Sequence, residues 1–150
     1  MSFNPSEVAL FVKRKLEKIS VFSYRLVIVP FNEPQRHWYF AACFPQHRAF
    51  AIVDSAPART RERAAIRDLR RFLKLWADFC GDGACEWTPI TISSPSQPGG
   101  YECGDFVAVN VDMLLLGQPL TYSSDIARIM MKETRMHLLN FSLFGKVPTM

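Results

Sequence analysis

Hydrophobic side chains recur along this chain with two different periods, and turn-forming residues separate the two kinds of segment. Short β-branched and aromatic runs at residues 24–30, 37–44 and 49–53 are separated by segments rich in Pro, Gln and Asn, which is typical of neighbouring strands. The short polar connections favour one antiparallel or mixed sheet. We predict a turn over residues 32–36 and a fourth, short strand over residues 86–92, at a sheet edge because it contains a proline.

Four other segments have the period or the apolar content of helices. We expect a peripheral helix over residues 5–19, a strong helix over residues 60–80 that a Gly-Asp-Gly sequence ends, and a buried helix over residues 107–116. Ser123 or Ser124 can cap a last helix, whose methionines we interpret as core side chains. The second helix has one apolar stripe, and the last helix carries apolar residues; they are Ile66, Leu69, Phe72, Leu73, Trp76 and Phe79, then Ile126, Ile129, Met130, Met136, Leu138 and Leu139.

Length and composition favour one soluble domain. The chain has 150 residues, of which 49% are hydrophobic, enough for a single core. No apolar run approaches the roughly 20 residues that cross a bilayer, and the first residues lack the pattern of a signal peptide. We therefore expect an intracellular protein, in the nucleus or cytoplasm, with its four cysteines reduced.

Charge and cysteine spacing add little specificity. A net charge of +4 permits an acidic partner but does not require nucleic acid. Cys80 and Cys85 have no second pair at metal-binding spacing, so we expect neither a zinc site nor another cofactor. The polar face of the helix over residues 60–80 and the residue before it is basic, and it is either a solvated face or a docking surface for phosphate or an acidic protein. Its cations are Arg59, Arg61, Arg63, Arg67, Arg70, Arg71 and Lys74.

Residues 96–106 carry the candidate nucleophile. They read Ser-Gln-Pro-Gly-Gly-Tyr-Glu-Cys-Gly-Asp-Phe and run directly into the buried helix, so we expect Cys103 at a helix N-terminus. There the unpaired backbone N–H groups and the helix dipole favour thiolate over thiol. Asp105 would disfavour that thiolate if its side chain faced it. The alternative is a buried structural cysteine at a loop-helix junction.

A cysteine nucleophile needs a base and a group that orients the base. His37 begins one predicted strand and Asp54 directly follows the next, 54 − 37 = 17 residues later. That separation suits neighbouring strands joined by a tight turn, which brings both side chains to the same edge of the sheet. An imidazole and a carboxylate could pair there, although either residue alone is more typical of a structural histidine or a turn former.

These residues occur in an order that resembles the Ulp/SENP family of SUMO-specific cysteine proteases. The His-Trp, Asp-Ser and Gln-x5-Cys-Gly sequences are the most specific parts, and the match runs from about residue 10 to about residue 140. The resemblance implies a papain-like α+β fold, with a small mixed sheet flanked by helices and a triad in the order His, Asp, Cys. The matching stretches are residues 12–14, 21–23, 29–32, 37–39, 53–55, 97–106 and 120–126, with Arg128.

The resemblance also implies roles for the site residues. His37 would be the general base, Asp54 would orient its imidazole, and Cys103 would attack the carbonyl carbon. The side-chain amide of Gln97, six residues before the cysteine (103 − 97 = 6), would stabilise the oxyanion together with the Cys103 backbone N–H.

Substrate selectivity follows from the same resemblance. Trp38 would form one wall of a narrow tunnel that admits a diglycine tail, although a core tryptophan is the alternative, and Gly104 would let substrate approach the helix start because it lacks a Cβ. We interpret residues 1–150 as a single catalytic domain of this type that lacks the family's N-terminal segment, which normally supplies the opposite tryptophan.

The implied function is a thiol-dependent peptidase or isopeptidase that cleaves after the C-terminal Gly-Gly of SUMO or another ubiquitin-like modifier. The expected partners are that modifier and its conjugates; a membrane and nucleic acid are not expected, and the oligomeric state stays open. One alternative is a truncated or degenerate relative that binds a modifier or an acidic partner without cleaving it. A second alternative is an acetyltransferase on the same fold, which would use the same acyl-cysteine chemistry at Cys103.

Overall fold

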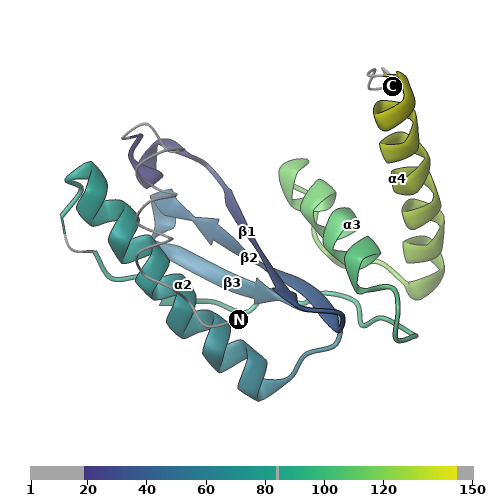
Figure 1. Ribbon diagram of the computed structural model, residues 1–150, viewed down its shortest axis with the longest axis horizontal. Coiled ribbons are helices and arrows are strands. Elements are labelled where there is room, and N and C mark those ends of the chain that lie inside the picture. The colour runs from purple at the N-terminus through teal and green to yellow at the C-terminus, as the bar shows by residue number, and fades with distance from the viewer. Residues whose placement is uncertain (1–18, 84, 145–150) are drawn as a thin grey trace.

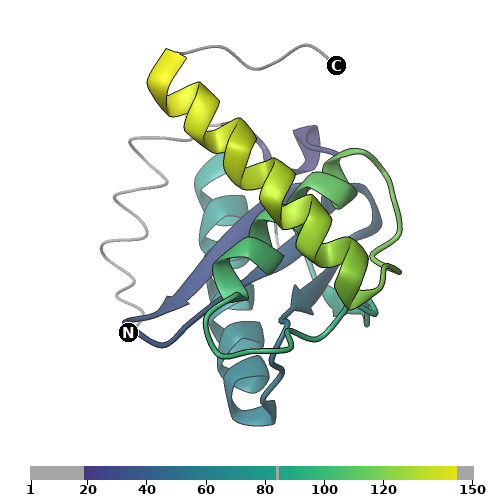
Figure 2. The same ribbon diagram turned by 90° about the vertical axis from the view of Figure 1, so that its right-hand side faces the viewer.

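The computed structural model describes residues 19–83 and 85–144. A small sheet lies between helices: α2 (Arg59–Cys80) covers one face, and α3 (Cys103–Leu115) covers the other (Figure 1). Helix α4 (Ser124–Phe144) packs against α3 on the side away from the sheet (Figure 2). The chain therefore has the α+β architecture that its hydrophobic pattern and family resemblance predicted.

The sheet is mixed and has the strand order β1-β2-β3-β4. Strands β1 (Val27–Glu33), β2 (His37–Phe44) and β3 (Ala49–Val53) are antiparallel, and β4 (Thr88–Pro89) pairs parallel to β3. The predicted bounds of β2 and β3 are confirmed at every residue. A single turn of 3-10 helix, Pro45–His47, connects these two strands.

The two edge strands differ from their predictions. β1 begins three residues later than expected and continues through Pro30 and Asn32 to its pairing of Glu33 with His37. The turn over 32–36 was thus predicted too long; only residues 34–36 turn, because proline is tolerated within an edge strand. The fourth strand was also predicted too long, since only Thr88–Pro89 pairs with β3, but its position at the edge is confirmed.

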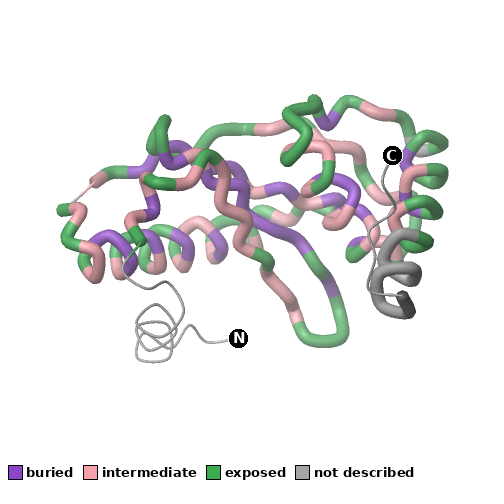
Figure 3. The backbone as a smooth tube through the Cα atoms, turned by 90° about the horizontal axis from the view of Figure 1, so that it is seen from above, coloured by how far each residue is buried: buried purple, intermediate pink, exposed green. Residues whose placement is uncertain are grey.

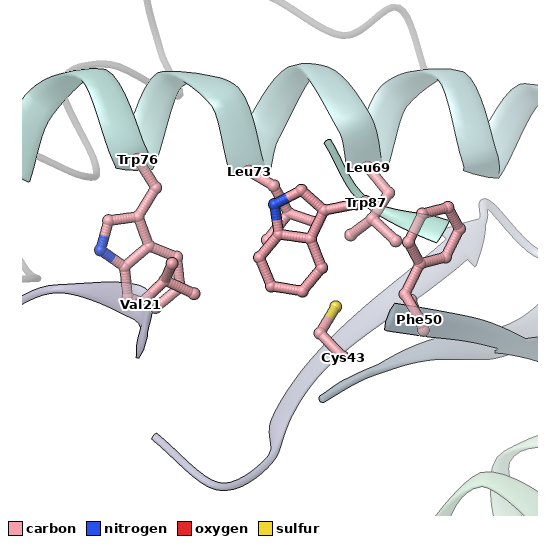
Figure 4. Close-up of a cluster of buried hydrophobic side chains, with 8 residues drawn as sticks. Val21, Cys43, Phe50, Leu69, Leu73, Trp76 and Trp87 are labelled. Atoms are coloured by element: carbon pink, nitrogen blue, oxygen red, sulfur yellow. The ribbon is translucent and has the colours of Figure 1, made fainter. Parts of the chain in front are cut away.

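Helix α2 and one face of the sheet enclose the largest core cluster (Figure 4). Along β2, Ala41 and Cys43 face α2, because successive side chains of a strand alternate between its two faces. A 3-10 turn, Val21–Ser23, closes one end of this core, and Trp87 reaches into it from the segment before β4. The predicted apolar stripe of α2 is confirmed, with Leu69, Leu73 and Trp76 fully enclosed and Ile66, Phe72 and Phe79 partly buried.

Helix α3 packs on the other face of the sheet and joins α4 to the domain. Phe40 and Ala42 of β2 meet Val107 and Val111 of α3, while Phe106 and Val109 of α3 meet α4. Figure 3 shows the buried residues gathered along the central strands and the inner sides of the helices. Because α4 packs mainly against α3, its buried side chains within the part described form a narrow strip consisting of Ala127 and Met131. The interpretation of the methionines as core side chains was wrong for Met136, and Ile126 and Ile129 of the same helix are exposed too.

The helix ends follow from local sequence. Gly81 ends α2 in the left-handed conformation, with φ of 76°, which glycine adopts without steric cost. Ser123 caps α4 by accepting a hydrogen bond from the Ile126 N–H at 3.3 Å, as one of the two predicted alternatives. The helix predicted over residues 5–19 lies outside the described residues, apart from Ile19. Within the described ranges, no helix is long and apolar enough to cross a bilayer.

Candidate active site

His37 and Asp54 form a buried pair at one end of the sheet. His37 is the first residue of β2, and Asp54 directly follows β3. Because these strands are antiparallel neighbours, both residues come to the same end, and the His37 Nε2 and Asp54 Oδ1 atoms lie 2.6 Å apart. Only 7% of either side chain is exposed. A short contact of this kind between imidazole and carboxylate is a strong hydrogen bond.

Three groups orient the Asp54 carboxylate. Oδ1 accepts the Ala56 backbone N–H at 2.9 Å in addition to His37 Nε2, and Oδ2 accepts a hydrogen bond from Arg61 Nη1 at 2.7 Å. Burial opposes the charge of Arg61, but the hydrogen bond to Asp54 and the negative charges of Asp54 and Glu33 outweigh that opposition and raise the pKa of the guanidinium. The Arg61 guanidinium is therefore bound to the Asp54 oxygen that does not contact His37.

The imidazole of His37 is held on its ring face as well as at one nitrogen. The Tyr39 ring stacks on it at 6.0 Å between centroids, and Phe31 stacks on Tyr39 at 5.1 Å. Burial raises the pKa of Tyr39, so that ring stays neutral near pH 7. Since Nε2 is bonded to Asp54, Nδ1 is the nitrogen left to exchange a proton with a nucleophile.

Cys103 is the first residue of α3, as the sequence predicted, and is nearly buried at 8% exposure. The first N–H groups of a helix have no partner inside the helix and favour a negative charge beside them. In the part of the chain described, Cys103 Sγ makes no hydrogen bond, either to His37 or to another residue. Such bonds are often long before substrate binds.

The loop that leads into α3 is attached to the residue next to Asp54. The Gln97 backbone N–H donates to the Ser55 carbonyl at 2.9 Å, and the Ser55 hydroxyl donates to Gln97 Oε1 at 2.7 Å. Ser55 is 4% exposed, so this hydroxyl has no access to bulk water. The double contact brings Gln97, and with it the loop before Cys103, to the end of the sheet that holds the His37–Asp54 pair.

The same contacts orient the Gln97 amide. Nε2 donates one of its two hydrogens to the Gly99 carbonyl, and Oε1 accepts from Ser55. A reversed amide would place two acceptors against each other at Gly99, so the partners determine which end carries the nitrogen. The second Nε2 hydrogen has no partner in the described ranges and is free for a substrate oxygen.

Asp105 does not carry an isolated charge near the cysteine. Arg135 of α4 forms a two-point ion pair with it: Arg135 Nε donates to Oδ1 at 2.8 Å, and Nη2 donates to Oδ2. Hydrogen bonding to Asp105 raises the pKa of Arg135. The pair directs the Asp105 carboxylate toward α4. This carboxylate was expected to disfavour a thiolate only if it faced Cys103, and its contact with Arg135 turns it toward α4 instead.

Trp38 and Gly104 each directly follow a candidate catalytic residue in the chain, His37 and Cys103. Trp38 follows His37 on β2, and its side chain is 44% exposed, so the alternative of a core tryptophan is wrong. Gly104 is the second residue of α3, and a Cβ built on it would meet no atom within 4 Å. Space therefore exists beside the nucleophile without any demand from the fold for glycine.

The other cysteines have different surroundings. All four are free thiols. Cys43 is fully enclosed between the sheet and α2, and burial raises its thiol pKa to about 12. Cys80 donates to the Ile19 carbonyl at 3.3 Å, and burial together with Asp82 raises its pKa. Of the cysteines in the described ranges, only Cys103 is the first residue of a helix.

Three residues that contact the site were not predicted to do so. Ser55 was noted only as part of the Asp-Ser sequence, Arg61 was counted with the basic face of α2, and Arg135 was not singled out. No sequence signal indicates that Ser55, two residues after β3, is buried. No sequence signal separates Arg61 or Arg135 from other surface arginines.

The chain was compared with known proteins. Residues 4–142 match the Ulp1 protease family, C-terminal catalytic domain. No curated protein sequence matches significantly. Among solved structures, the C-terminal Ulp1 protease domain in complex with Smt3, the yeast orthologue of SUMO, is similar with a TM-score of 0.75 at 22% identity, over 90% of this chain and 62% of that one.

Two further solved structures have the same fold. The SUMO protease Ulp1 with its catalytic cysteine oxidised to a sulfonic acid is similar with a TM-score of 0.74 at 23% identity, over 93% of this chain and 63% of that one. The Ulp1-like SUMO protease catalytic domain of Chaetomium thermophilum is similar with a TM-score of 0.67 at 22% identity, over 91% of this chain and 54% of that one. The chain thus spans less than two thirds of each of these domains.

Proposed function

We propose that this chain, which belongs to the Ulp1 protease family, is a single catalytic domain that cleaves after the C-terminal Gly-Gly of SUMO or another ubiquitin-like modifier. One observation carries the proposal: the 2.6 Å His37–Asp54 pair and the Gln97 loop before Cys103 are joined through Ser55 at one end of the sheet. A solved relative of the same fold is bound to Smt3, which supports a modifier as partner, in the nucleus or cytoplasm.

The acyl-transfer step would use His37 and Cys103. Nδ1 of His37 takes the thiol proton, and Sγ attacks the carbonyl carbon of the last glycine to form a tetrahedral intermediate. When that intermediate collapses, the C–N bond breaks and the imidazolium returns the proton to the leaving amine. Water then attacks the thioester carbonyl carbon. His37 takes the proton of the water and returns it to the Cys103 sulfur when the C–S bond breaks. Asp54 stabilises the imidazolium through the Nε2 hydrogen bond without taking its proton.

Two donors would stabilise the oxyanion of both intermediates. The free Nε2 hydrogen of Gln97 and the backbone N–H of Cys103 come from the same loop-helix junction. Because Ser55 and Gly99 already hold the amide, little reorganisation is needed when negative charge develops.

Trp38 and Gly104 would select the substrate. The exposed indole of Trp38 offers a flat apolar wall, and the empty space at Gly104 leaves room for a chain without side chains. In the proposed function, these two positions would select a diglycine tail over residues that carry a Cβ.

The proposal is tested with freshly reduced protein and SUMO bearing a C-terminal vinyl sulfone. We expect a covalent adduct that maps to Cys103, no adduct with Cys103→Ser, and an unchanged adduct with Cys85→Ser, which removes a more exposed thiol. Release of a C-terminal amine from a modifier fusion should follow the same pattern, with the serine variant slower by three orders of magnitude or more.

Other outcomes would contradict the proposal. Failure to react with every ubiquitin-like modifier tried, or equal reaction of Cys103→Ser, would exclude this chemistry. Tight modifier binding without turnover, unchanged in Cys103→Ala, would favour a binding protein instead. Acetylation of Cys103 by labelled acetyl-CoA, measured by mass, would favour an acetyltransferase.

A further inference from the structure

Arg61 differs from the other cations on the basic face of α2 because its side chain lies in the candidate site. It is the third residue of α2, and only 17% of its side chain is exposed, whereas its neighbours Arg59 and Arg63 are exposed. Surface ion pairs at Arg67 and Lys74 remain within their own helix. Arg61 is therefore different from the other cations of the helix.

The Arg61 guanidinium joins three separate parts of the chain. Nη1 donates to Asp54 Oδ2 at 2.7 Å and to the Ala56 carbonyl at 2.8 Å, in the segment after β3. Nε lies 3.3 Å from Glu33 Oε1 at the end of β1. The guanidinium carbon also stands 5.6 Å from the centre of the Tyr39 ring, on β2. A planar group with several donors suits this arrangement better than a lysine would.

These contacts fix the orientation of the Asp54 carboxylate group. A carboxylate can rotate about its Cβ–Cγ bond, but with Oδ2 bound to Arg61 the other oxygen, Oδ1, faces His37 Nε2. Tyr39 contacts both the guanidinium and the imidazole, so the same residue limits movement of each.

The charges around Asp54 do not cancel its own. Arg61 alone would neutralise the carboxylate and weaken its attraction for an imidazolium, but Glu33 supplies a second negative charge to the same guanidinium. Glu33, Arg61 and Asp54 together carry one net negative charge. The arrangement thus fixes the carboxylate and still offers negative charge to His37.

We propose that Arg61 is a positioning residue of the active site: through Asp54 it holds the His37 imidazole with Nε2 occupied and Nδ1 directed to the nucleophile. Its effect on catalysis rests on the proposed function, but its effect on the His37–Asp54 hydrogen bond does not.

The test compares Arg61→Met and Arg61→Lys with Arg63→Met, a matched control on the exposed face of the same helix. For Arg61→Met we expect kcat to fall about tenfold to a hundredfold, as part of the roughly 10²–10⁴ that general acid–base catalysis contributes, with KM changed less than about twofold. Arg61→Lys should retain more activity, because an ammonium can still reach Oδ2. Arg63→Met should match the unaltered chain.

A spectroscopic readout separates positioning from general stability. The Nε2 proton between His37 and Asp54 should give a downfield proton NMR signal, assigned by its loss in Asp54→Asn. Arg61→Met should shift or remove this signal at temperatures where thermal melting shows the variant folded, and Arg63→Met should leave it in place.

A folded Arg61→Met with unchanged signal and unchanged kcat would overturn the proposal. If that variant does not fold, Arg61→Lys decides: a shifted signal with lowered kcat supports positioning, and an unshifted signal with full kcat contradicts it. An inactive unaltered chain would contradict the proposed function, while the signal would still test the role of Arg61.

Discussion

The two faces of the sheet differ in how completely the fold holds the candidate site. On the α2 face, the largest core cluster continues into a set of close contacts around Asp54, which include Arg61, Tyr39 and His37. On the α3 face, the loop before Cys103 includes the almost fully exposed Tyr101, and Cys103 Sγ has no hydrogen bond in the described part of the chain.

The difference teaches which half of the chemistry the fold prepares in advance. A base works only in one tautomer and orientation, so several neighbours that hold it are an advantage. A nucleophile must instead admit substrate, and free space beside Gly104 serves that need. A side-chain hydrogen bond from Ser55 to Gln97 links the residue after Asp54 to the loop before Cys103, so breaking this contact tests the comparison most directly.

Breaking that contact should give the largest effect. Gln97→Ala should lower kcat by about 10²–10³, because it removes an oxyanion donor, and Ser55→Ala by about tenfold, because the amide loses one hydrogen bond. Both act through the same amide, so Ser55→Ala should change kcat less than about twofold in the Gln97→Ala background. Steady-state kinetics on a cleavable modifier fusion measures this cycle.

Ser96→Ala is the control for the cycle, since it removes an exposed hydroxyl beside Gln97. It should leave kcat unchanged. Losses that simply add in the double variant would mean that Ser55 acts on something other than the Gln97 amide.

Because the core between the sheet and α2 is closed to solvent, we expect the free energy of unfolding to change at alkaline pH. Burial raises the thiol pKa of Cys43 from 9.0 to about 12, so above pH 9 the unfolded chain loses this proton while the folded chain keeps it. The free energy of unfolding should therefore be intact below pH 9 and should fall by about 1.4 kcal/mol per pH unit from pH 9 toward pH 12.

Urea unfolding at pH 8 and pH 10 measures the change, and Cys43→Ala is the comparison because it lacks the titrating group. Tyr122, whose pKa burial raises from 10.0 to about 12, adds the same trend only above pH 10. An equal pH dependence in Cys43→Ala would show that solvent reaches this core.

Much of the half of the molecule on the α2 face of the sheet can be predicted from the sequence. β2 and β3 are predicted to the residue because uninterrupted apolar runs end at Pro45 and Asp54, and the stripe of α2 is predicted because its period is regular. The positions of His37 and Cys103 at element starts follow from the same boundaries.

The rest depends on partners that local sequence does not contain. β4 is only two residues long because its ladder requires the backbone of Arg48 and Phe50, which lie far away in the chain. Ile126 is exposed because α4 packs mainly against a single helix, α3. Arg61 has the same local sequence features as its solvated neighbours, and only the arrival of Asp54 beside the first turn of α2 makes it part of the site.

The substitution with the smallest expected effect tests the half of the site at the start of α3. Gly104 has helical neighbours and free space around its missing Cβ, so Gly104→Ala should stabilise the fold by about 0.5–1 kcal/mol. If substrate uses that space, kcat/KM should nevertheless fall by about three- to tenfold. Thermal melting and steady-state kinetics give the two values, with Gly100→Ala in the exposed turn as control. Higher stability with lower activity would assign the space to substrate; unchanged kcat/KM would mean that substrate passes elsewhere.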